Sequence, residues 1–158
     1  MVTACRRALA GQGAALVVLV GTEVVPLSQV FLLVALQLAC AFEAAGFGAG
    51  ALAALQGLGR TKDHLGQRVA RLALSVVLWG LAARHVVLVL DPMMTGTLLV
   101  TGSTWALAGA GWLVAGTTGW RRPWSAPESL GRQALWLGLV AVLGGVNTLA
   151  MAAVRAAV

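Results

Sequence analysis

The sequence has few charged residues: Asp, Glu, Lys and Arg together make up 10% of the 158 residues, whereas 59% are hydrophobic. Soluble domains carry roughly 25% charged residues, so this shortage excludes a water-soluble globular fold. Tyrosine is absent, and Lys62 is the only lysine. Together with abundant glycine and alanine, this bias is typical of a GC-rich genome and favours a bacterial source.

Cysteine and catalytic motifs are also scarce. We expect Cys5 in an N-terminal tail and Cys40 within an apolar run, a spacing that forms neither a CxxC pair nor a metal-ligand set. Both are therefore predicted to be free, structural thiols, and no metal site is expected. The chain lacks G-x-S-x-G, H-E-x-x-H, a P-loop and paired intramembrane aspartates. A self-sufficient enzyme is therefore not indicated.

The apolar residues form runs long enough to cross a bilayer. The stretch 8–59 would extend about 78 Å as one helix, more than twice the roughly 30 Å of hydrocarbon, so it must fold back. Its best turn is Gly21–Ser28, which gathers Gly, Thr, Glu, Pro and Ser. The sequence predicts an all-α fold, a polytopic transmembrane bundle of about five spans in a single domain, 1–158, with helices at about 8–24, 27–57, 69–90, 97–118 and 134–157.

The net charge of +6 would suggest nucleic acid in a soluble protein, but the basic residues lie in short gaps between the apolar runs. Nine of the eleven basic residues form three clusters: Arg6 and Arg7, 60–71 and 121–132. If two helices separate each cluster from the next, all three lie on one side of the membrane. The positive-inside rule then predicts a cytoplasmic N-terminus, in a bacterial inner membrane, and no nucleic-acid partner.

Two further features bear on the membrane boundaries. Arg6 and Arg7 before an apolar stretch are similar to a signal peptide, but no small-residue cleavage site follows, so we expect an uncleaved first helix. The third basic cluster is flanked by Trp120, Trp124 and Trp136. An aromatic belt at the membrane interface is expected there.

Glu43 falls near the middle of the second predicted helix, where a carboxylate is costly and suggests a functional site. It could couple a proton or cation, or it could be a neutral carboxyl that only joins two helices through a hydrogen bond. Asn147, at similar depth in the fifth helix, is the predicted partner. Gln37 is a second candidate.

The predicted outer end of the bundle holds Glu23, Arg84, His85 and Asp91. These residues could line an entrance or bind an ion, or Arg84 could extend outward to pair with Asp91. The only other histidine, His64, is expected on the opposite side, so a bis-histidine haem within one chain is not expected. Haem or pigment is not expected, although a single-histidine ligand or a haem shared with another subunit stays open.

Three tryptophans, Trp79, Trp105 and Trp112, are expected deep in the membrane, where they could wall a pocket for lipid, quinone or pigment or simply pack against small residues. Packing is the favoured explanation, and a bound lipid is the plausible ligand if a pocket forms. Small residues also recur at spacing four, in a pattern that permits close helix contact. They are Gly102, Ala106 and Ala110 in the fourth helix and Gly46 and Gly50 in the second.

Few intramembrane charges, many small-residue faces and almost no soluble mass favour a non-catalytic membrane subunit that packs against and stabilises a larger membrane complex. Its partners would be the lipid bilayer and other membrane subunits or copies of itself. The alternative is a small homo-oligomeric transporter or channel that uses Glu43 for coupling. A lipid- or quinone-binding enzyme is a third, weaker possibility.

Overall fold

The computed structural model describes residues 1–58, 65–91, 98–118 and 130–158, apart from the side chains of 98, 115–118, 130 and 131. Within these ranges the only regular secondary structure is α-helix, which confirms the predicted all-α class. The five helices are α1 (Val2–Val24), α2 (Gln29–Leu58), α3 (Leu65–Leu90), α4 (Leu98–Thr118) and α5 (Leu130–Ala156).

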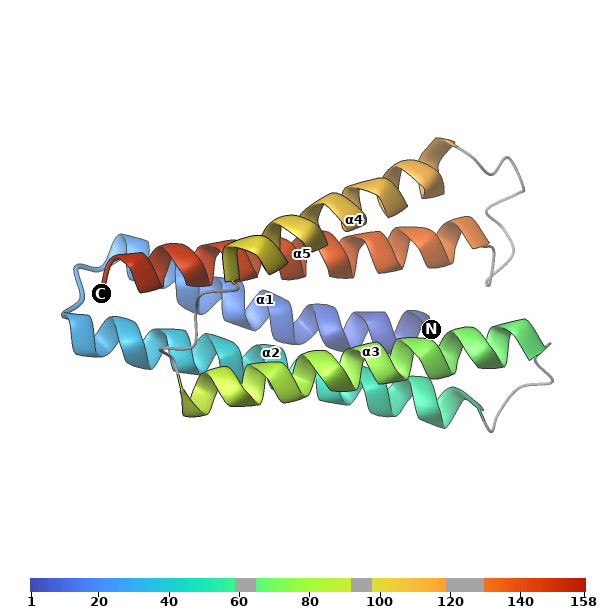
Figure 1. The fold of residues 1–158 in the computed structure, drawn as a ribbon, viewed down its shortest axis with the longest axis horizontal. Coiled ribbons are helices and arrows are strands. Elements are labelled where there is room, and N and C mark those ends of the chain that lie inside the picture. Colours follow the sequence, from blue (N-terminus) through green and yellow to red (C-terminus); the bar gives the residue numbers. More distant parts are fainter. Residues whose placement is uncertain (59–64, 92–97, 119–129) are drawn as a thin grey trace.

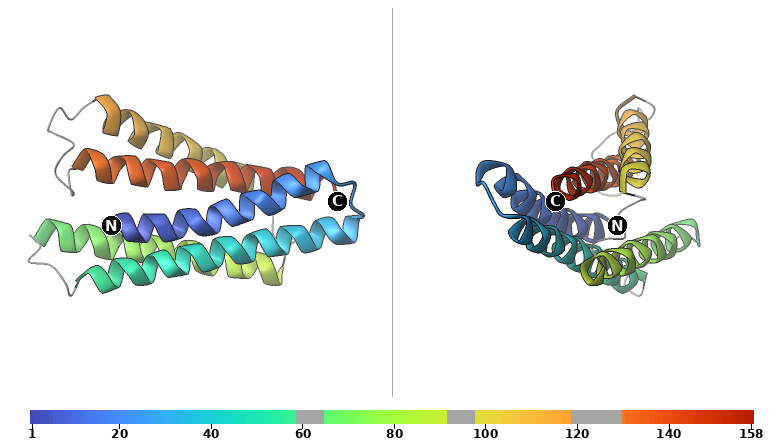
Figure 2. Two further views of the ribbon diagram at one scale, coloured as in Figure 1. Left: turned by 180° about the vertical axis from the view of Figure 1, so that it is seen from behind. Right: turned by 60° about the vertical axis from the view of Figure 1, so that its left-hand side comes forward.

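The helices form a curved row rather than a closed ring (Figures 1 and 2). Their order across the row is α4, α5, α1, α2, α3, since each helix packs on its neighbours in that order and α2 also touches α5. Among the described residues, α3 and α4 do not pack on each other, although they follow one another in the sequence. They stand at the two ends of the arc and leave its mouth open (Figure 2).

Three predicted helix boundaries are wrong because helices continue past the apolar span. The first begins at Val2 instead of 8, which places Cys5 inside a helix and buries it, in contrast to the predicted tail. The third begins at Leu65 and the fifth at Leu130, each four residues early. The additional residues include Arg and Gln, which form helices well in an aqueous interface, so hydropathy marks the membrane span but not the helix end.

The turn that folds the first apolar run back on itself is shorter than predicted. Helix α1 continues through Gly21 to Val24, and the connection is 25–28. Val25 has extended backbone angles, as expected of a residue before proline, because the Pro26 ring disfavours helical geometry there. The backbone N–H of Leu32 bonds to the Ser28 carbonyl at 3.0 Å, which begins the next helix.

Helices α1, α2, α3 and the Arg132–Ala156 part of α5 are each long and apolar enough to cross a membrane. In α4 the described apolar stretch is shorter, Leu99–Val114, but the whole helix of 21 residues extends about 30 Å. Large aliphatic and aromatic side chains are exposed along the outside of all five helices. These properties define a helical, multi-pass membrane protein.

The starts of α1, α3 and α5 lie toward one end of the molecule, and the C-terminus lies beside the α1–α2 turn at the other (Figure 1). At the first of these ends the Arg6 guanidinium lies over the Trp136 ring, 5.3 Å from its centroid, a distance at which a cation is attracted to an indole face. Trp120 and Trp124 of the expected aromatic belt lie outside the described residues, as do four of the nine residues of the basic clusters: Arg60, Lys62, Arg121 and Arg122.

Helices α1 and α2 approach until their backbones touch. A Cβ atom added to Gly11 would lie 2.5 Å from the Gly46 Cα, and one added to Gly50 would lie 2.7 Å from the Ala4 carbonyl oxygen. At these distances between the two backbones only glycine, whose side chain is a hydrogen atom, fits without overlap. The predicted contact surface at Gly46 and Gly50 is therefore confirmed, and its partner is α1.

A second close contact joins α4 to α5. A Cβ on Gly145 would lie 2.5 Å from the Ala106 nitrogen and 2.7 Å from the Gly102 carbonyl oxygen. Gly102 and Ala106 thus face α5 as predicted, but Ala110 is exposed. The contact continues instead through Gly109, which is seven residues from Gly102, because two turns of helix return almost to the same face.

This contact predicts that Ala106→Leu destabilises the protein by about 1–3 kcal/mol, because the larger side chain must separate the α4 and α5 backbones. Ala110→Leu, on the exposed side of the same helix, is the matched control and should leave stability nearly unchanged. Thermal unfolding in detergent measures both. Equal melting temperatures for the two variants would contradict the assigned α4–α5 contact.

Candidate functional site

Glu43 is a carboxylate enclosed by the protein halfway along α2. Its side chain is 1% exposed, although nearly every neighbour in α2 is apolar. The close approach of Gly11 to Gly46, one turn further along α2, brings α1 against this face, and α5 packs on both helices. Glu43 therefore lies where three helices meet, away from the lipid-facing surface.

Asn147 of α5 is the direct partner of Glu43. Its Nδ2 donates one hydrogen bond to Glu43 Oε1, at 2.6 Å, and another to the main-chain carbonyl oxygen of Gln12, at 2.7 Å. Asn147 is fully buried, like Glu43. One amide group thus joins α1, α2 and α5, and the pairing inferred from equal depth in the sequence is present in the structure.

Gln12 of α1 completes this polar centre, and the sequence reasoning missed it. Its side chain is 0% exposed, and its Nε2 donates to the Val140 carbonyl oxygen at 3.0 Å. A Cβ at Gly144 would lie 2.8 Å from the same nitrogen, so the glycine makes room for the Gln12 amide. The available signal was a single amide residue within the apolar first helix, at the same depth as Glu43.

Three oxygen atoms of the polar centre have no protein partner among the described residues. They are Gln12 Oε1, Glu43 Oε2 and Asn147 Oδ1. All three are acceptors while the carboxyl is ionised, and each belongs to a residue that is no more than 1% exposed. A buried polar atom without a partner is costly. The centre therefore has acceptor capacity that the protein itself does not use.

Gln37, the second candidate partner for Glu43, serves another contact. Its Nε2 donates to the Val89 carbonyl oxygen at 3.1 Å and so links α2 to α3. Ser75 and Arg71 make similar bonds from α3 to the Ala51 and Gly57 carbonyl oxygens, at 3.2 and 2.8 Å. These polar groups connect two helices and do not extend the centre at Glu43.

The expected outer charged cluster is not assembled. Glu23 is exposed near the end of α1, and Asp91 is exposed just beyond α3. His85 is buried against Phe47, with ring centroids 5.3 Å apart, and its Nδ1 lies 2.8 Å from the Leu81 carbonyl oxygen. Because Phe47 is one turn from Glu43, His85 lies deep in the bundle and not at its outer end.

Arg84, next to His85, is partly buried, and its Nη2 has no protein partner among the described residues. It makes no ion pair with Glu43. The orientation of α3 explains the separation of the four residues: α3 packs on α2 but not on α1, so Glu23 cannot reach the side chains of α3.

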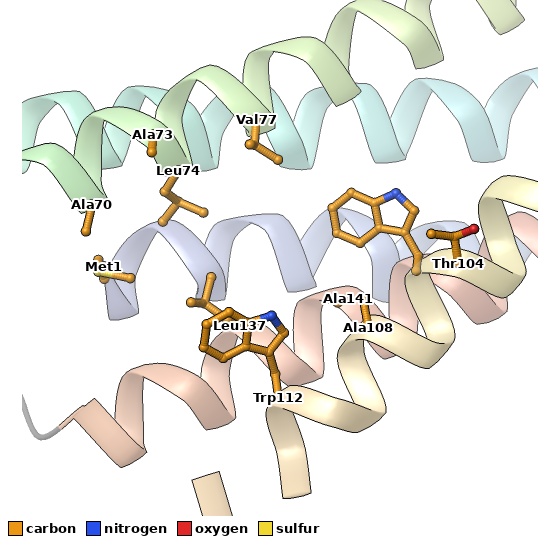
Figure 3. A pocket seen from close by; sticks show the side chains of 11 residues that line it. Met1, Ala70, Ala73, Leu74, Val77, Thr104, Ala108, Trp112, Leu137 and Ala141 are labelled. Carbon is orange, nitrogen blue, oxygen red and sulfur yellow. The ribbon is translucent and has the colours of Figure 1, made fainter. Parts of the chain in front are cut away.

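A cavity of about 430 Å³ opens between α3 and α4, at the mouth of the arc (Figure 3). We call it the α3–α4 groove. Figure 3 shows Trp112 reaching from α4 into the space that faces α3, with Leu137 of α5 on its floor. It is lined by Met1, Ala70, Ala73, Leu74, Val77, Thr104, Trp105, Ala108, Trp112, Leu137 and Ala141.

Two of the three predicted pocket tryptophans therefore share one cavity. Trp79 does not line it: its ring lies 3.9 Å from the Cβ that Gly48 would carry, on the α2 side of α3. The only hydroxyl of the lining, Thr104 Oγ1, donates to the Val100 carbonyl oxygen of its own helix at 2.8 Å. The groove therefore suits an apolar occupant.

Neither cysteine is part of a reactive group. Cys5 and Cys40 are both buried and free, and the Cys40 thiol contacts the sulfur of Met151 at 3.7 Å. In the part of the chain that the structure describes, no three His, Cys, Asp or Glu side chains gather as metal ligands do. His64 lies outside those residues.

The fold and this site define a multi-pass helical membrane protein with a polar centre buried among three helices and an apolar groove open at one side. No family model, curated protein or solved structure matches the chain.

Proposed function

We propose that the protein is a non-catalytic membrane subunit that binds a transmembrane helix of a partner protein in the α3–α4 groove and thereby stabilises a larger complex. The observation that carries this proposal is the open mouth of the arc, where the described residues of α3 and α4, two consecutive helices, do not pack on each other. Helices in a monomeric bundle normally close such a gap by mutual packing.

The lining of the groove supports a helix as the occupant. Four of the lining residues, from α3, α4 and α5, have small side chains that let another helix backbone approach closely: Ala70, Ala73, Ala108 and Ala141. Trp105 and Trp112 add large, rigid surfaces of the kind that supplies most binding energy at protein interfaces. A bound lipid or quinone is the competing occupant, since the cavity volume falls within the range of small-molecule sites.

Substitutions in α4 test the occupant. Ala108→Trp should fill the groove and reduce recovery of the partner chain at least tenfold when the protein is purified from its native membrane in mild detergent. Ala110→Trp, two residues away and outside the groove, should retain the partner in stoichiometric amount. A homogeneous homo-oligomer, or lipid as the only molecule displaced by Ala108→Trp, would contradict the subunit proposal.

The proposal includes an orientation in a bacterial inner membrane, with the N-terminus in the cytoplasm. It rests on the basic residues near the starts of α1, α3 and α5, which lie toward one end of the molecule. Reporter fusions in 59–64 and 119–129 should both report the cytoplasm, and fusions in 92–97 and at the C-terminus should report the opposite side. Opposite locations for the first two would overturn the five-span topology.

A small homo-oligomeric transporter is the second candidate, because a carboxyl group buried at mid-membrane is typical of ion and proton pathways. The specific observation in its favour is Glu43 Oε2, a carboxyl oxygen that has no partner among the described residues and belongs to a side chain 1% exposed. The subunit proposal treats the same group as a structural link between helices.

A further inference from the structure

We propose that the polar centre at Gln12, Glu43 and Asn147 binds one alkali-metal cation, held by Glu43 Oε2 and the side-chain amide oxygens of Gln12 and Asn147. This site is separate from the α3–α4 groove and does not depend on the proposed subunit function. It would give the protein a stability that depends on the monovalent cation of its surroundings.

The chemistry of the free atoms points to a cation. Every atom of the centre that lacks a protein partner is an oxygen: Gln12 Oε1, Glu43 Oε2 and Asn147 Oδ1. The amide nitrogens of Gln12 and Asn147 already donate hydrogen bonds. A proton on Glu43 would supply one donor for the remaining acceptors, whereas a single cation can contact several oxygens together. Oxygen ligands are those that hard cations prefer.

The three oxygens belong to one small region. Glu43 Oε2 and Asn147 Oδ1 are each bonded to the same carbon as an atom of the 2.6 Å hydrogen bond between these residues. The Gln12 amide lies beside Gly144, within one helical turn of Asn147 on α5. Gly144 carries no side chain that would close this space.

Charge balance selects a monovalent ion. A buried carboxylate needs a positive partner to offset the loss of hydration, and no described basic side chain contacts Glu43. With one carboxylate and two neutral amides, a single positive charge makes the centre neutral. A divalent ion would leave an excess charge in hydrocarbon, and the other two carboxylates among the described residues, Glu23 and Asp91, are exposed at helix ends.

Cation binding can be tested on the full-length chain purified in detergent at constant pH. The melting temperature, followed by tryptophan fluorescence, is measured in sodium, potassium and lithium chloride, with choline chloride keeping the ionic strength constant. We expect a saturable increase with at least one alkali cation over choline, and equilibrium dialysis against radioactive sodium or rubidium should give one bound ion per chain. Equal melting in all salts together with no bound ion would overturn the proposal.

Three variants assign the site. Glu43→Gln keeps an oxygen to accept the Asn147 hydrogen bond but removes the charge, so it should fold and bind the cation at least tenfold more weakly. Glu23→Gln removes an exposed carboxylate of α1 and should bind normally. If Glu43→Gln does not fold, Gln12→Met, which removes only an amide, should show the weakened binding. Unchanged binding in the variant that folds would overturn the assignment.

Among the basic side chains that the structure describes, Arg84 is the one that could take the place of the ion, since its Nη2 is buried there without a protein partner. Arg84→Met should leave the bound ion in place if the centre holds an alkali cation. A lower melting temperature of Arg84→Met, together with no bound ion in the unmodified protein, would show that the guanidinium supplies the positive charge. That result would overturn the proposal.

Discussion

Gly11→Leu should prevent the chain from folding into a stable bundle, the largest effect that we expect from a single substitution. The ideal Cβ position lies 2.5 Å from both the Gly46 Cα and the Phe42 carbonyl oxygen. These are backbone atoms, so no side-chain rotation can relieve the overlap. The expected cost exceeds the roughly 1–3 kcal/mol typical of overpacking, because α1 and α2 must separate along the helix that carries Glu43.

Gly13→Leu is the matched control for this substitution. Gly13 lies two residues away in α1, and nothing in the described structure comes within 4 Å of the Cβ it would carry. Both variants add the same side chain to the same helix. The yield of monodisperse protein after solubilisation compares them, and a normal yield of Gly11→Leu would show that α1 and α2 do not cross at these glycines.

Glu43→Ala should be the more damaging of two substitutions at the polar centre. It removes the acceptor at 2.6 Å from Asn147 Nδ2 and so breaks the buried hydrogen bond through which the Asn147 amide joins α5 to α2. A buried polar group left unsatisfied costs about 1–3 kcal/mol, and the void left by the missing atoms adds to the loss. Glu43→Gln retains an acceptor oxygen and nearly the same volume, so in choline chloride, without an alkali cation, its stability should remain close to that of the unmodified protein.

The two substitutions also separate the candidate functions when assembly and ion flux are measured together. For a structural subunit, Glu43→Gln should retain the partner chain, and the unmodified protein alone should carry no flux in reconstituted vesicles. A transporter would give a flux that Glu43→Gln abolishes while the variant still assembles. That result would replace the subunit proposal by the transporter.

The sequence determined the fold class, the helix count and the shared depth of Glu43 and Asn147. Long apolar runs can satisfy their backbone hydrogen bonds in a bilayer only as helices, so hydropathy alone predicts them. Depth along a helix follows from residue number, which is why Asn147 could be matched with Glu43. The depth of a residue does not say to which side of the helix its side chain points. For this reason the sequence wrongly placed Ala110 on the face of α4 that contacts another helix, whereas it is exposed.

The tertiary structure decided which helices are neighbours. Nearly every residue of these spans is apolar, and the helices carry no strongly polar face, so no pattern in the sequence identifies the side that meets another helix. The packing of α5 between α1 and α4 brings Gln12 to Asn147, residues 135 positions apart. It also leaves α3 and α4 unpaired, and so opens the groove. These contacts arise from the fit of small residues on distant segments, and only folding brings those segments together.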